Sequence, residues 1–287
     1  MILLLSPLSF LYGTGMFIRR KSAKRKDFGI PIVSVGNLIV GGSGKTPFVI
    51  ALASRYSDVA VISRGYGRQS KGLVEVSRKG KVLASVEESG DEPMLMAQSL
   101  SHASVIVSED RHAAVALAKE QGAKLIILDD GFNRVEIGKF EILLEPQRIK
   151  NPFPFPAGPF REFIFCKRAA DIVAKEGEDF MRKVSYEALT ERMILVTAIS
   201  DPQRLDKYLP SGVVHRIYLP DHAYFDVSYL EEQMHQYQAK SILVTEKDAV
   251  KMDSFKLPLS KMKLKLEIKE TVLEKTDRYV KEYGDEE

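Results

Sequence analysis

Residues 35–47, VGNLIVGGSGKTP, form a glycine-rich stretch between a β-branched run and an apolar run with helical spacing. Glycines let backbone N–H groups converge on phosphate oxygens, because no Cβ stands in the way. Lys45 brings a positive charge to the β- and γ-phosphates, and Thr46 offers a hydroxyl to Mg²⁺. Although Ile39 replaces the first glycine of the strict GxxxxGK(S/T) pattern, the stretch predicts a nucleoside triphosphate site. Its expected contacts are Gly41, Gly42, Ser43, Gly44, Lys45, Thr46 and Pro47.

Two adjacent acids supply a second part of phosphate chemistry. Asp129 and Asp130 follow four apolar residues in the stretch LIILDDG and precede Gly131. Alone, they would indicate an ordinary turn at the end of a strand. A phosphate loop, however, works with a carboxylate at the end of a neighbouring strand, which helps to hold Mg²⁺. Thr46, Asp129 and Asp130 are therefore predicted metal ligands.

A parallel sheet is needed to bring these segments together. From Ile30 onward, short β-rich runs alternate with helical runs, which is typical of crossover connections and of a sheet covered by helices on both faces. Ligands of such sheets bind beyond the carboxyl ends of the strands. The expected strands are 31–35, 59–63, 104–108 and 124–131, and the expected helices are 46–56, 92–100 and 110–121, with a hairpin over 73–85.

A proline-rich stretch divides the chain. Residues 146–160 hold five prolines, which suits an ordered loop or an interdomain connection. Strand and helix patterns then resume, which predicts a second, smaller α/β domain. The sequence thus predicts an N-terminal segment over 1–28, a P-loop kinase-like nucleotide-binding domain over 29–165 and a smaller domain over 166–287.

The N-terminal segment is apolar and then basic. Residues 1–18 carry no charge, and six of the eight residues from Arg19 to Lys26 are basic. The order is the reverse of a signal peptide, and Pro7 together with two glycines interrupts the stretch as a spanning helix. One interpretation is a core-packed helix followed by a solvated basic turn. The other, which the adjacent basic cluster favours, is a monotopic anchor on an anionic leaflet.

The composition excludes several classes of protein. Hydrophobic residues make up 45% and charged residues 28%, which is typical of a globular protein rather than a disordered one. The net charge of +3 is too small to indicate a nucleic-acid binder. The single cysteine, Cys166, excludes an internal disulfide framework and suits a reducing compartment, and the five histidines lack metal-ligand spacing.

Eight short segments, taken in order, resemble those of one family. They are VGNLIVGGSGKTP (35–47), SRGYGR (63–68), GDEPMLMA (90–97), EDR (109–111), DDGF (129–132), PAGPFRE (156–162), PDH (220–222) and TEKDAVK (245–251). Together they resemble the tetraacyldisaccharide 4′-kinases of lipid A biosynthesis. The resemblance implies Mg²⁺- and ATP-dependent phosphorylation of the 4′-hydroxyl of a tetraacylated glucosamine disaccharide 1-phosphate, which gives a lipid IVA type of product.

The resemblance also implies roles for single residues. Asp91 of GDEP and His222 of PDH act together at the acceptor hydroxyl, with Lys45 as the third catalytic residue. Without the resemblance, Asp91 would be interpreted as a helix cap and His222 as a loop histidine. Glu162 is expected near the metal. Arg64, Arg111 and Arg161 are expected to bind substrate, and Thr245 and Lys247 to make nucleotide or interdomain contacts.

Two positions depart from the family pattern. Asn133 and Arg134 follow DDGF, where the family usually has glutamine and histidine, so the role of that histidine is absent or taken by Arg134. Phe163 stands where the family has the proline of its REP motif. Each change affects the role expected of individual residues and not the resemblance to the family.

Two other functions compete with the kinase. A membrane-associated ATPase switch of the partitioning or septum-placement type has a similar loop, but it carries an additional lysine where this chain has Val40. A non-catalytic lipid-surface module would not need a phosphate loop with an acid pair. We therefore expect a peripheral or monotopic kinase at the cytoplasmic face of the bacterial inner membrane, with a lipid disaccharide and the membrane surface as partners, and with neither nucleic acid nor an obligate protein partner.

Overall fold

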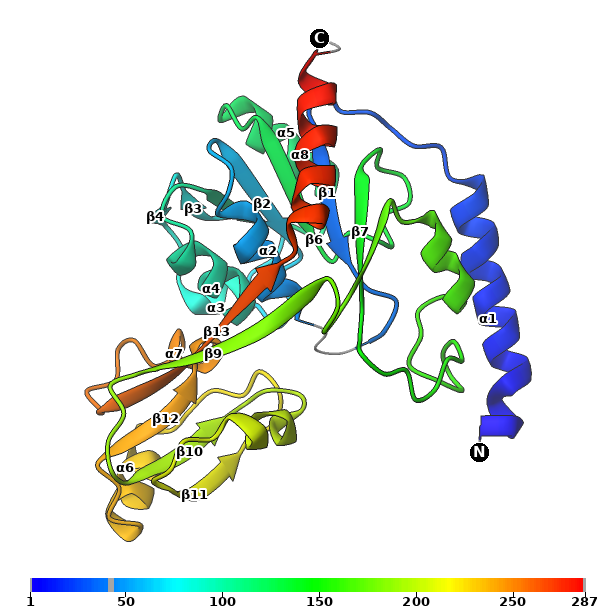
Figure 1. Cartoon of the computed structure of the whole chain (residues 1–287). Coiled ribbons are helices and arrows are strands. Elements are labelled where there is room, and N and C mark those ends of the chain that lie inside the picture. Colours follow the sequence, from blue (N-terminus) through cyan, green and yellow to red (C-terminus); the bar gives the residue numbers. More distant parts are fainter. Residues whose placement is uncertain (1, 41–43, 286–287) are drawn as a thin grey trace.

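Two β-sheets organise the chain (Figure 1). The computed structural model describes residues 2–40 and 44–285. In these residues the larger sheet has the strand order β4-β3-β5-β2-β6-β1-β7-β8, and the smaller sheet has the order β11-β10-β12-β13-β9. All pairings are parallel except those of β3 with β4 and β5, and that of β9 with β13.

The bounds of the elements match most of the sequence prediction. The strands are β1 Ile32–Gly36, β2 Val59–Ser63, β3 Val74–Arg78, β4 Lys81–Val82, β5 Ser104–Val107, β6 Leu125–Asp129, β7 Phe140–Glu145, β8 Ile172–Lys175, β9 Phe180–Glu187, β10 Met193–Thr197, β11 Val213–Tyr218, β12 Ser241–Thr245 and β13 Leu259–Ile268. The α-helices are α1 Ile2–Ser22, α2 Lys45–Ala53, α3 Val86–Ser89, α4 Asp91–Ser99, α5 Arg111–Glu120, α6 Val227–Gln236, α7 Glu246–Ala249 and α8 Glu270–Asp285, with 3₁₀ turns η1 Ile164–Ala169 and η2 Pro202–Tyr208.

The central strands are buried on both faces, and their alternate residues serve two separate cores. Val33 and Val61 face the core that α2, α4 and α8 cover. Ile32, Ile62 and their neighbours face the core that α5 covers. This period of two is the geometry of a strand, and a parallel sheet must be covered on both faces. The predicted parallel α/β sheet with helices on both faces is therefore confirmed.

The division between the two sheets differs from the boundary expected at residues 165 and 166. Strand β8, which follows this position, pairs with β7 in the larger sheet. The proline-rich loop before it folds back on the larger sheet instead of leaving it, since Val40 N donates to Pro159 O and Arg161 N donates to Leu38 O. The chain passes to the smaller sheet only through the long antiparallel ribbon of β9 and β13 (Figure 1).

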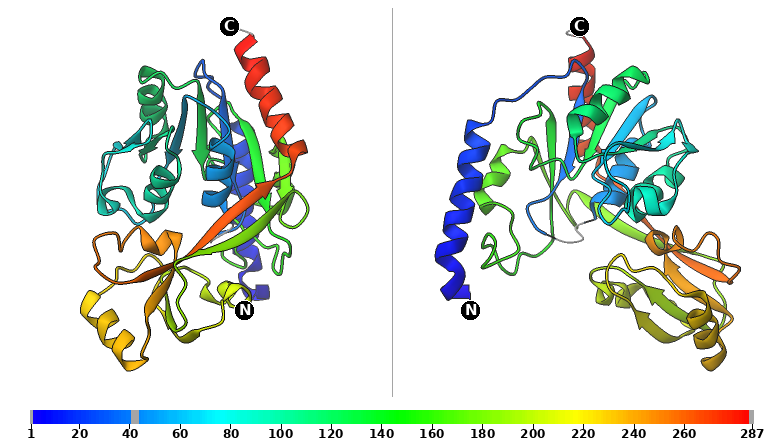
Figure 2. Two further views of the ribbon diagram at one scale, coloured as in Figure 1. Left: turned by 60° about the vertical axis from the view of Figure 1, so that its left-hand side comes forward. Right: turned by 180° about the vertical axis from the view of Figure 1, so that it is seen from behind.

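The C-terminal helix returns to the larger sheet. Val272 and Leu273 of α8 lie in the same core as α2 and α4. Figure 2 shows α8, in red, beside the larger sheet at the far end of the ribbon from the smaller sheet. Residues 166–287 therefore contribute strand β8 to the larger sheet and helix α8 to the core that covers it, and only the strands from β9 to β13 form the smaller sheet.

Helix α1 lies along the proline-rich loop (Figure 2). It runs without interruption through Pro7, and its packed face includes Ser9, whose hydroxyl donates to Pro154 O. A Cβ at Gly13 would lie 2.7 Å from the ring of Phe163, so the helix approaches the loop closely at this glycine. Three aromatic pairs continue this contact: Phe10–Phe163, Tyr12–Phe155 and Phe17–Phe165.

The opposite side of α1 is apolar and exposed. Leu4, Leu8, Leu11 and Ile18 recur at helical spacing, and their exposed fractions run from 56% to 85%. We call these four residues the exposed stripe. No helix among the described residues is both long enough and apolar enough to span a bilayer. The exposed stripe shows that α1 is not fully buried in a core.

Candidate active site

A cleft of about 1510 Å³ separates the two sheets. From the larger sheet it is lined by the start of α2 and by the turn that follows β6, and from the smaller sheet by the loop that follows β11. All three lie at carboxyl ends of parallel strands, which is where ligands of such sheets bind. Lys45, Thr46, Asp129, Asp130 and His222 all line this cleft.

The phosphate loop ends at the first residue of α2. Gly44 caps the helix with a φ of 80°, a left-handed conformation that favours glycine. Lys45 follows, and its ammonium donates to Asn37 Oδ1 at 3.2 Å. Arg182 reaches this point from β9, since its Nη2 would lie 2.8 Å from a Cβ at Gly44. Gly41, Gly42 and Ser43 lie outside the described residues, so their predicted contacts stay predictions.

The Asp129–Asp130 turn faces the start of α2. Asp130 has a φ of 55°, the left-handed region that non-glycine residues seldom adopt outside functional turns. Its carboxylate lies 3.6 Å from Lys45 Nζ and accepts two hydrogen bonds from Arg161 Nη1, at 2.8 and 2.9 Å. Although burial acts to raise it, the pKa of Asp130 is held below its usual value by these two cations.

The pKa of Asp129 is shifted in the opposite direction to that of Asp130. Asp129 is buried at the end of β6, and its Oδ2 accepts a hydrogen bond from Ser63 Oγ at 2.9 Å. Burial, with the neighbouring charge of Glu92 adding to it, raises the pKa of Asp129 to about 7. Its Oδ1 is buried and has no hydrogen-bond partner among the described residues.

The unpartnered oxygen of Asp129 fits a divalent cation. A buried carboxylate oxygen without a partner is costly, and a cation or its water shell would satisfy it. Thr46 is also buried and offers a hydroxyl in the same cleft. Carboxylate and hydroxyl oxygens are ligands that Mg²⁺ prefers, so the residues present suit the metal that the sequence predicts.

Glu162 pairs with an arginine of α1, and its expected place near the metal stays a prediction. Both of its carboxylate oxygens accept hydrogen bonds from Arg20 of α1, at 2.7 and 2.8 Å. Its side chain is 1% exposed, and the described residues contain no group of three or more His, Cys, Asp or Glu side chains that could hold a metal. The structure therefore joins Glu162 to α1, because Arg20 satisfies the carboxylate that was expected near the metal.

Asp91 and His222 meet across the cleft. Asp91 begins α4 in the larger sheet, and His222 lies after β11 in the smaller sheet. The Nδ1 of His222 lies 2.9 and 3.0 Å from the two oxygens of Asp91. His222 has a φ of 63°, and the ring of Tyr66 lies 5.2 Å from its own. The structure thus brings together the two residues that the sequence separates by 131 positions.

The two pKa shifts of this pair favour its charged forms. Its hydrogen bond to Asp91 raises the pKa of His222 above the usual value. The pKa of Asp91 is lowered: burial opposes this, but the hydrogen bond to His222 and the charge of Lys247 outweigh it. Both shifts favour an imidazolium beside a carboxylate.

Two lysines of the smaller sheet surround Asp91. Lys247 Nζ lies 3.8 Å from Asp91 Oδ2 and 3.0 Å from Glu92 Oε1, which is the interdomain contact expected of Lys247. Lys251 Nζ is buried 3.7 Å from Asp91 Oδ2 and donates to Ala223 O at 2.9 Å. Thr245 lines the cleft, and its hydroxyl donates to Asp248 Oδ2 within its own turn, so its nucleotide contact stays a prediction. Lys251 is not among the predicted residues, although its spacing of four from Lys247 is a signal for a shared helix face.

The predicted substrate-binding arginines occupy three different environments. Arg64 is exposed and lines the cleft, where it can contact substrate. Arg161 also lines the cleft but is paired with Asp130. Arg111 is 3% exposed and donates to Ser108 O, and burial lowers its pKa to about 10. Arg111 therefore lies beneath the surface, so its substrate contact stays a prediction. Arg134, in place of the expected histidine, lies 4.0 Å from Glu136.

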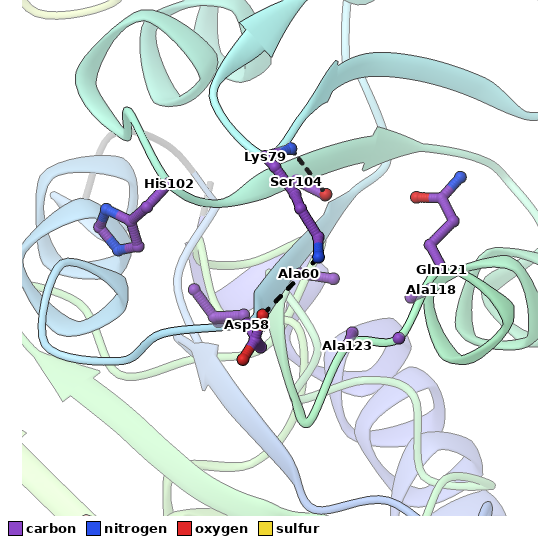
Figure 3. Close-up of a pocket in the computed structure, with 10 residues that line it drawn as sticks. Asp58, Ala60, Lys79, His102, Ser104, Ala118, Gln121 and Ala123 are labelled. Atoms are coloured by element: carbon purple, nitrogen blue, oxygen red, sulfur yellow. Dashed lines mark hydrogen bonds and ion pairs between the residues drawn. The ribbon is translucent and has the colours of Figure 1, made fainter.

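A second, small pocket lies at the opposite edge of the larger sheet (Figure 3). It is lined by residues that precede or begin β2, β5 and β6, so it lies at the amino ends of these strands. Lys79 spans it, with its ammonium 3.8 Å from Asp58 and its backbone N–H bonded to Ser104 (Figure 3). Gln121 Oε1 in its lining has no hydrogen-bond partner among the described residues, but the pocket holds only about 10 Å³, too little for a ligand, so we assign it none.

Comparisons with known proteins agree with one another. The family model described as tetraacyldisaccharide-1-P 4′-kinase matches residues 1–281. A protein named tetraacyldisaccharide 4′-kinase from Helicobacter pylori strain HPAG1 is 50% identical over 285 residues, which cover 99% of this chain and 91% of that protein. One of the same name from Aliarcobacter butzleri is 46% identical over 277 residues, which cover 94% and 88%. A solved structure of LpxK from Aquifex aeolicus in complex with ATP shares 30% identity and a TM-score of 0.81, and covers 97% of this chain and 99% of that one.

Proposed function

Because this chain belongs to the tetraacyldisaccharide-1-phosphate 4′-kinase family, it is an ATP-dependent kinase of lipid A biosynthesis, and we propose that Asp91 and His222 activate its acceptor hydroxyl. The acceptor is the 4′-hydroxyl of a tetraacylated glucosamine disaccharide 1-phosphate. The observation that carries the proposal is the hydrogen bond between Asp91 and His222, which faces the same cleft as Lys45 and Asp129.

The phosphate end of the cleft stabilises charge. Lys45 and Arg161 flank Asp130, and both cations are placed to neutralise charge on the transferring phosphoryl group. Thr46 and Asp129 would hold Mg²⁺, which neutralises phosphate charge when it is bound. Phosphoryl transfer needs little covalent chemistry from a protein, so positioning and charge are the main contributions of these residues.

The other end of the cleft handles the proton of the acceptor. A sugar hydroxyl is a poor nucleophile at neutral pH, and a positioned base that accepts its proton assists the attack. Since Nδ1 of His222 donates to Asp91, its Nε2 is the atom left to accept the hydroxyl proton. Asp91 fixes the ring and stabilises the imidazolium that results. Lys247 and Lys251 hold Asp91 ionised during this step.

Helix α1 suits a lipid substrate. Its exposed stripe lies on the side opposite the proline-rich loop, and it is followed by the exposed basic residues Arg19, Lys21, Lys24, Arg25 and Lys26. An apolar helix face beside a basic cluster binds the interface of an anionic leaflet. We propose that α1 docks the enzyme on the cytoplasmic leaflet of the inner membrane, where ATP and the lipid acceptor meet.

Transfer of label tests the enzymatic proposal. The chain is incubated with γ-labelled ATP and the lipid acceptor in mixed micelles, and the lipid is separated by thin-layer chromatography. We expect label on the lipid with the wild-type chain, and none with Lys45→Ala at an unchanged circular-dichroism melt. Label found only as inorganic phosphate would support the ATPase switch instead and would contradict the kinase.

Sedimentation with anionic vesicles tests the docking of α1. We expect Leu8→Ser with Leu11→Ser to lose most vesicle binding while nucleotide binding is retained. Leu83→Ser is the matched control, because Leu83 is also about half exposed but lies outside α1. Equal sedimentation of all three proteins would refute the docking proposal and leave the kinase proposal unaffected.

A further inference from the structure

One basic residue of α1 points into the protein. Arg20 lies in the last turn of the helix, and its side chain is 8% exposed, whereas Arg19 beside it is 48% exposed. Its Nε and Nη2 donate to the two oxygens of Glu162, at 2.7 and 2.8 Å. Nη2 also donates to Phe132 O at 2.9 Å, and the guanidinium carbon lies 4.0 Å from the centre of the Phe132 ring. A buried, bidentate arginine of this kind fixes geometry more tightly than a lysine could.

Both partners of Arg20 are close in sequence to Asp130 and Arg161, the ion pair that faces the predicted phosphate site. Phe132 is two residues beyond Asp130, and Glu162 directly follows Arg161. Asp130 and Arg161 are themselves joined at 2.8 Å. Arg20 therefore holds both chain segments whose side chains form that pair.

The Asp129–Asp130 turn needs such support. Asp130 is in a left-handed conformation, which is unfavourable for a residue with a Cβ and persists only where the surroundings fix it. Phe132 is buried against Gly36 of β1, where a Cβ would lie 2.5 Å from that of Phe132. Arg19 Nη2 adds a hydrogen bond to Asn133 O at 3.1 Å, so two successive residues of α1 bind two successive carbonyls of the turn.

We propose that Arg20 is a positioning residue that fixes the Asp129–Asp130 turn and Arg161 to α1, so that the helix with the exposed stripe and the phosphate-facing turn act as one body. Docking of α1 on a leaflet then steadies the turn. The proposal rests on the proposed function only in assigning the turn to phosphate and α1 to the membrane.

Hydrogen exchange of the free enzyme measures the positioning directly. Amides of residues 130–136 are followed in the wild type, Arg20→Met, Arg20→Lys and the control Arg216→Met, with neither nucleotide nor metal present. We expect exchange on the order of tenfold faster in Arg20→Met, an intermediate rate in Arg20→Lys and the wild-type rate in Arg216→Met. Equal acceleration over all strands of the larger sheet would show general loss of stability and overturn the proposal. Arg20→Lys keeps the test valid if Arg20→Met does not fold.

Vesicles test the link to α1. Anionic vesicles are expected to slow exchange of residues 130–136 in the wild type and to leave it unchanged in Arg20→Lys, at equal amounts of sedimented protein. Slowing of the same size in both proteins would overturn the link. Kinetics separate this result from the proposed function: we expect Arg20→Lys to raise the Mg²⁺ concentration needed for half-maximal rate, whereas activity in Lys45→Ala would mean that the site itself is wrongly assigned.

Discussion

Two buried carboxylates, Asp91 and Glu162, each pair with a cation from a distant part of the chain, but the two pairs differ in what surrounds them. His222, the partner of Asp91, lines the cleft, and its hydrogen bond to Asp91 raises its pKa above the usual value. Arg20, the partner of Glu162, is enclosed between α1 and the proline-rich loop and keeps its charge at every physiological pH.

This difference suits the Asp91–His222 pair to a chemical role and the Arg20–Glu162 pair to a positioning role. A proton acceptor must reach the substrate and must change its charge, and only the Asp91–His222 pair does both. A positioning contact must hold one geometry without changing its charge, which a sealed arginine–carboxylate pair achieves. His222 Nδ1 lies 2.9 Å from Asp91, and Arg20 Nε lies 2.7 Å from Glu162. The two pairs are thus similar in geometry but differ in function, because the cleft reaches the first pair and not the second.

The largest effect is expected from loss of the cleft pair. Asp91→Ala and His222→Ala should each lower kcat by about 10²–10⁴-fold, with little change in the apparent KM for ATP, because neither residue holds the nucleotide. Residues that act as a unit are non-additive, so the double variant should be little worse than the more severe single one. Steady-state kinetics on the three variants check this. If the two losses multiply, Asp91 and His222 act independently.

Breaking the buried Arg20–Glu162 pair should mainly lower the free energy of unfolding. Arg20→Met leaves the carboxylate of Glu162 buried without its partner, which typically costs about 3–5 kcal/mol of unfolding free energy. Removing both charges, as in Arg20→Met with Glu162→Met, should recover much of this loss, because no buried charge remains. Urea unfolding of the single and double variants measures both values. A double variant as unstable as Arg20→Met would contradict this account of the pair.

The variant Arg20→Met with Glu162→Met also separates a positioning role of Arg20 from a purely stabilising one. Its unfolding free energy should recover, but fast hydrogen exchange of the amides of residues 130–136 should remain, since Phe132 O has still lost its donor. A stabilising role alone would restore both properties.

The pH dependence should move in opposite directions in two variants. His222 must be neutral at Nε2 to accept a proton, so the rate falls as the pH drops below its pKa. Asp91 raises that pKa, so Asp91→Asn should shift the acid limb of kcat to lower pH. Lys247 lowers it, so Lys247→Met should shift the acid limb to higher pH. Rate profiles of the three proteins check this, and a shift in the same direction in both variants would exclude His222 as the base.

Most of the fold could be predicted, because the strands of the larger sheet are short β-branched runs between helical ones. Strand β7 was missed since Glu141 interrupts its apolar pattern, and the ion pair with buried Lys139, at 2.8 Å, that permits this is not visible in sequence. Strand β9 was missed because only its first residue, Phe180, is buried, so the strand lacks the alternating apolar pattern that a core requires.

The site was predictable where local motifs carry the chemistry. Lys45, Asp129 and Asp130 stand in segments whose order and composition indicate phosphate binding. Partners across the fold were not predictable: Arg20 was grouped with the basic cluster, and Glu162 was assigned to the metal. Helix phase explains the different position of Arg20, since Arg20 alone of that cluster falls on the packed face of α1 with Ser9 and Gly13.

The smallest effect is expected from an exposed pair with the same distance as the enclosed one. Arg216 Nη1 and Asp206 Oδ1 are also 2.7 Å apart, but the two side chains are 48% and 46% exposed. Water screens such a pair, and both side chains lose freedom in forming it, so Arg216→Met should cost less than about 1 kcal/mol of unfolding free energy. Urea unfolding beside Arg20→Met gives the comparison directly, and kcat should equal that of the wild type. If Arg216→Met cost as much as Arg20→Met, burial would not be the difference between the two pairs, and the assignment of Arg20 to positioning would lose its physical basis.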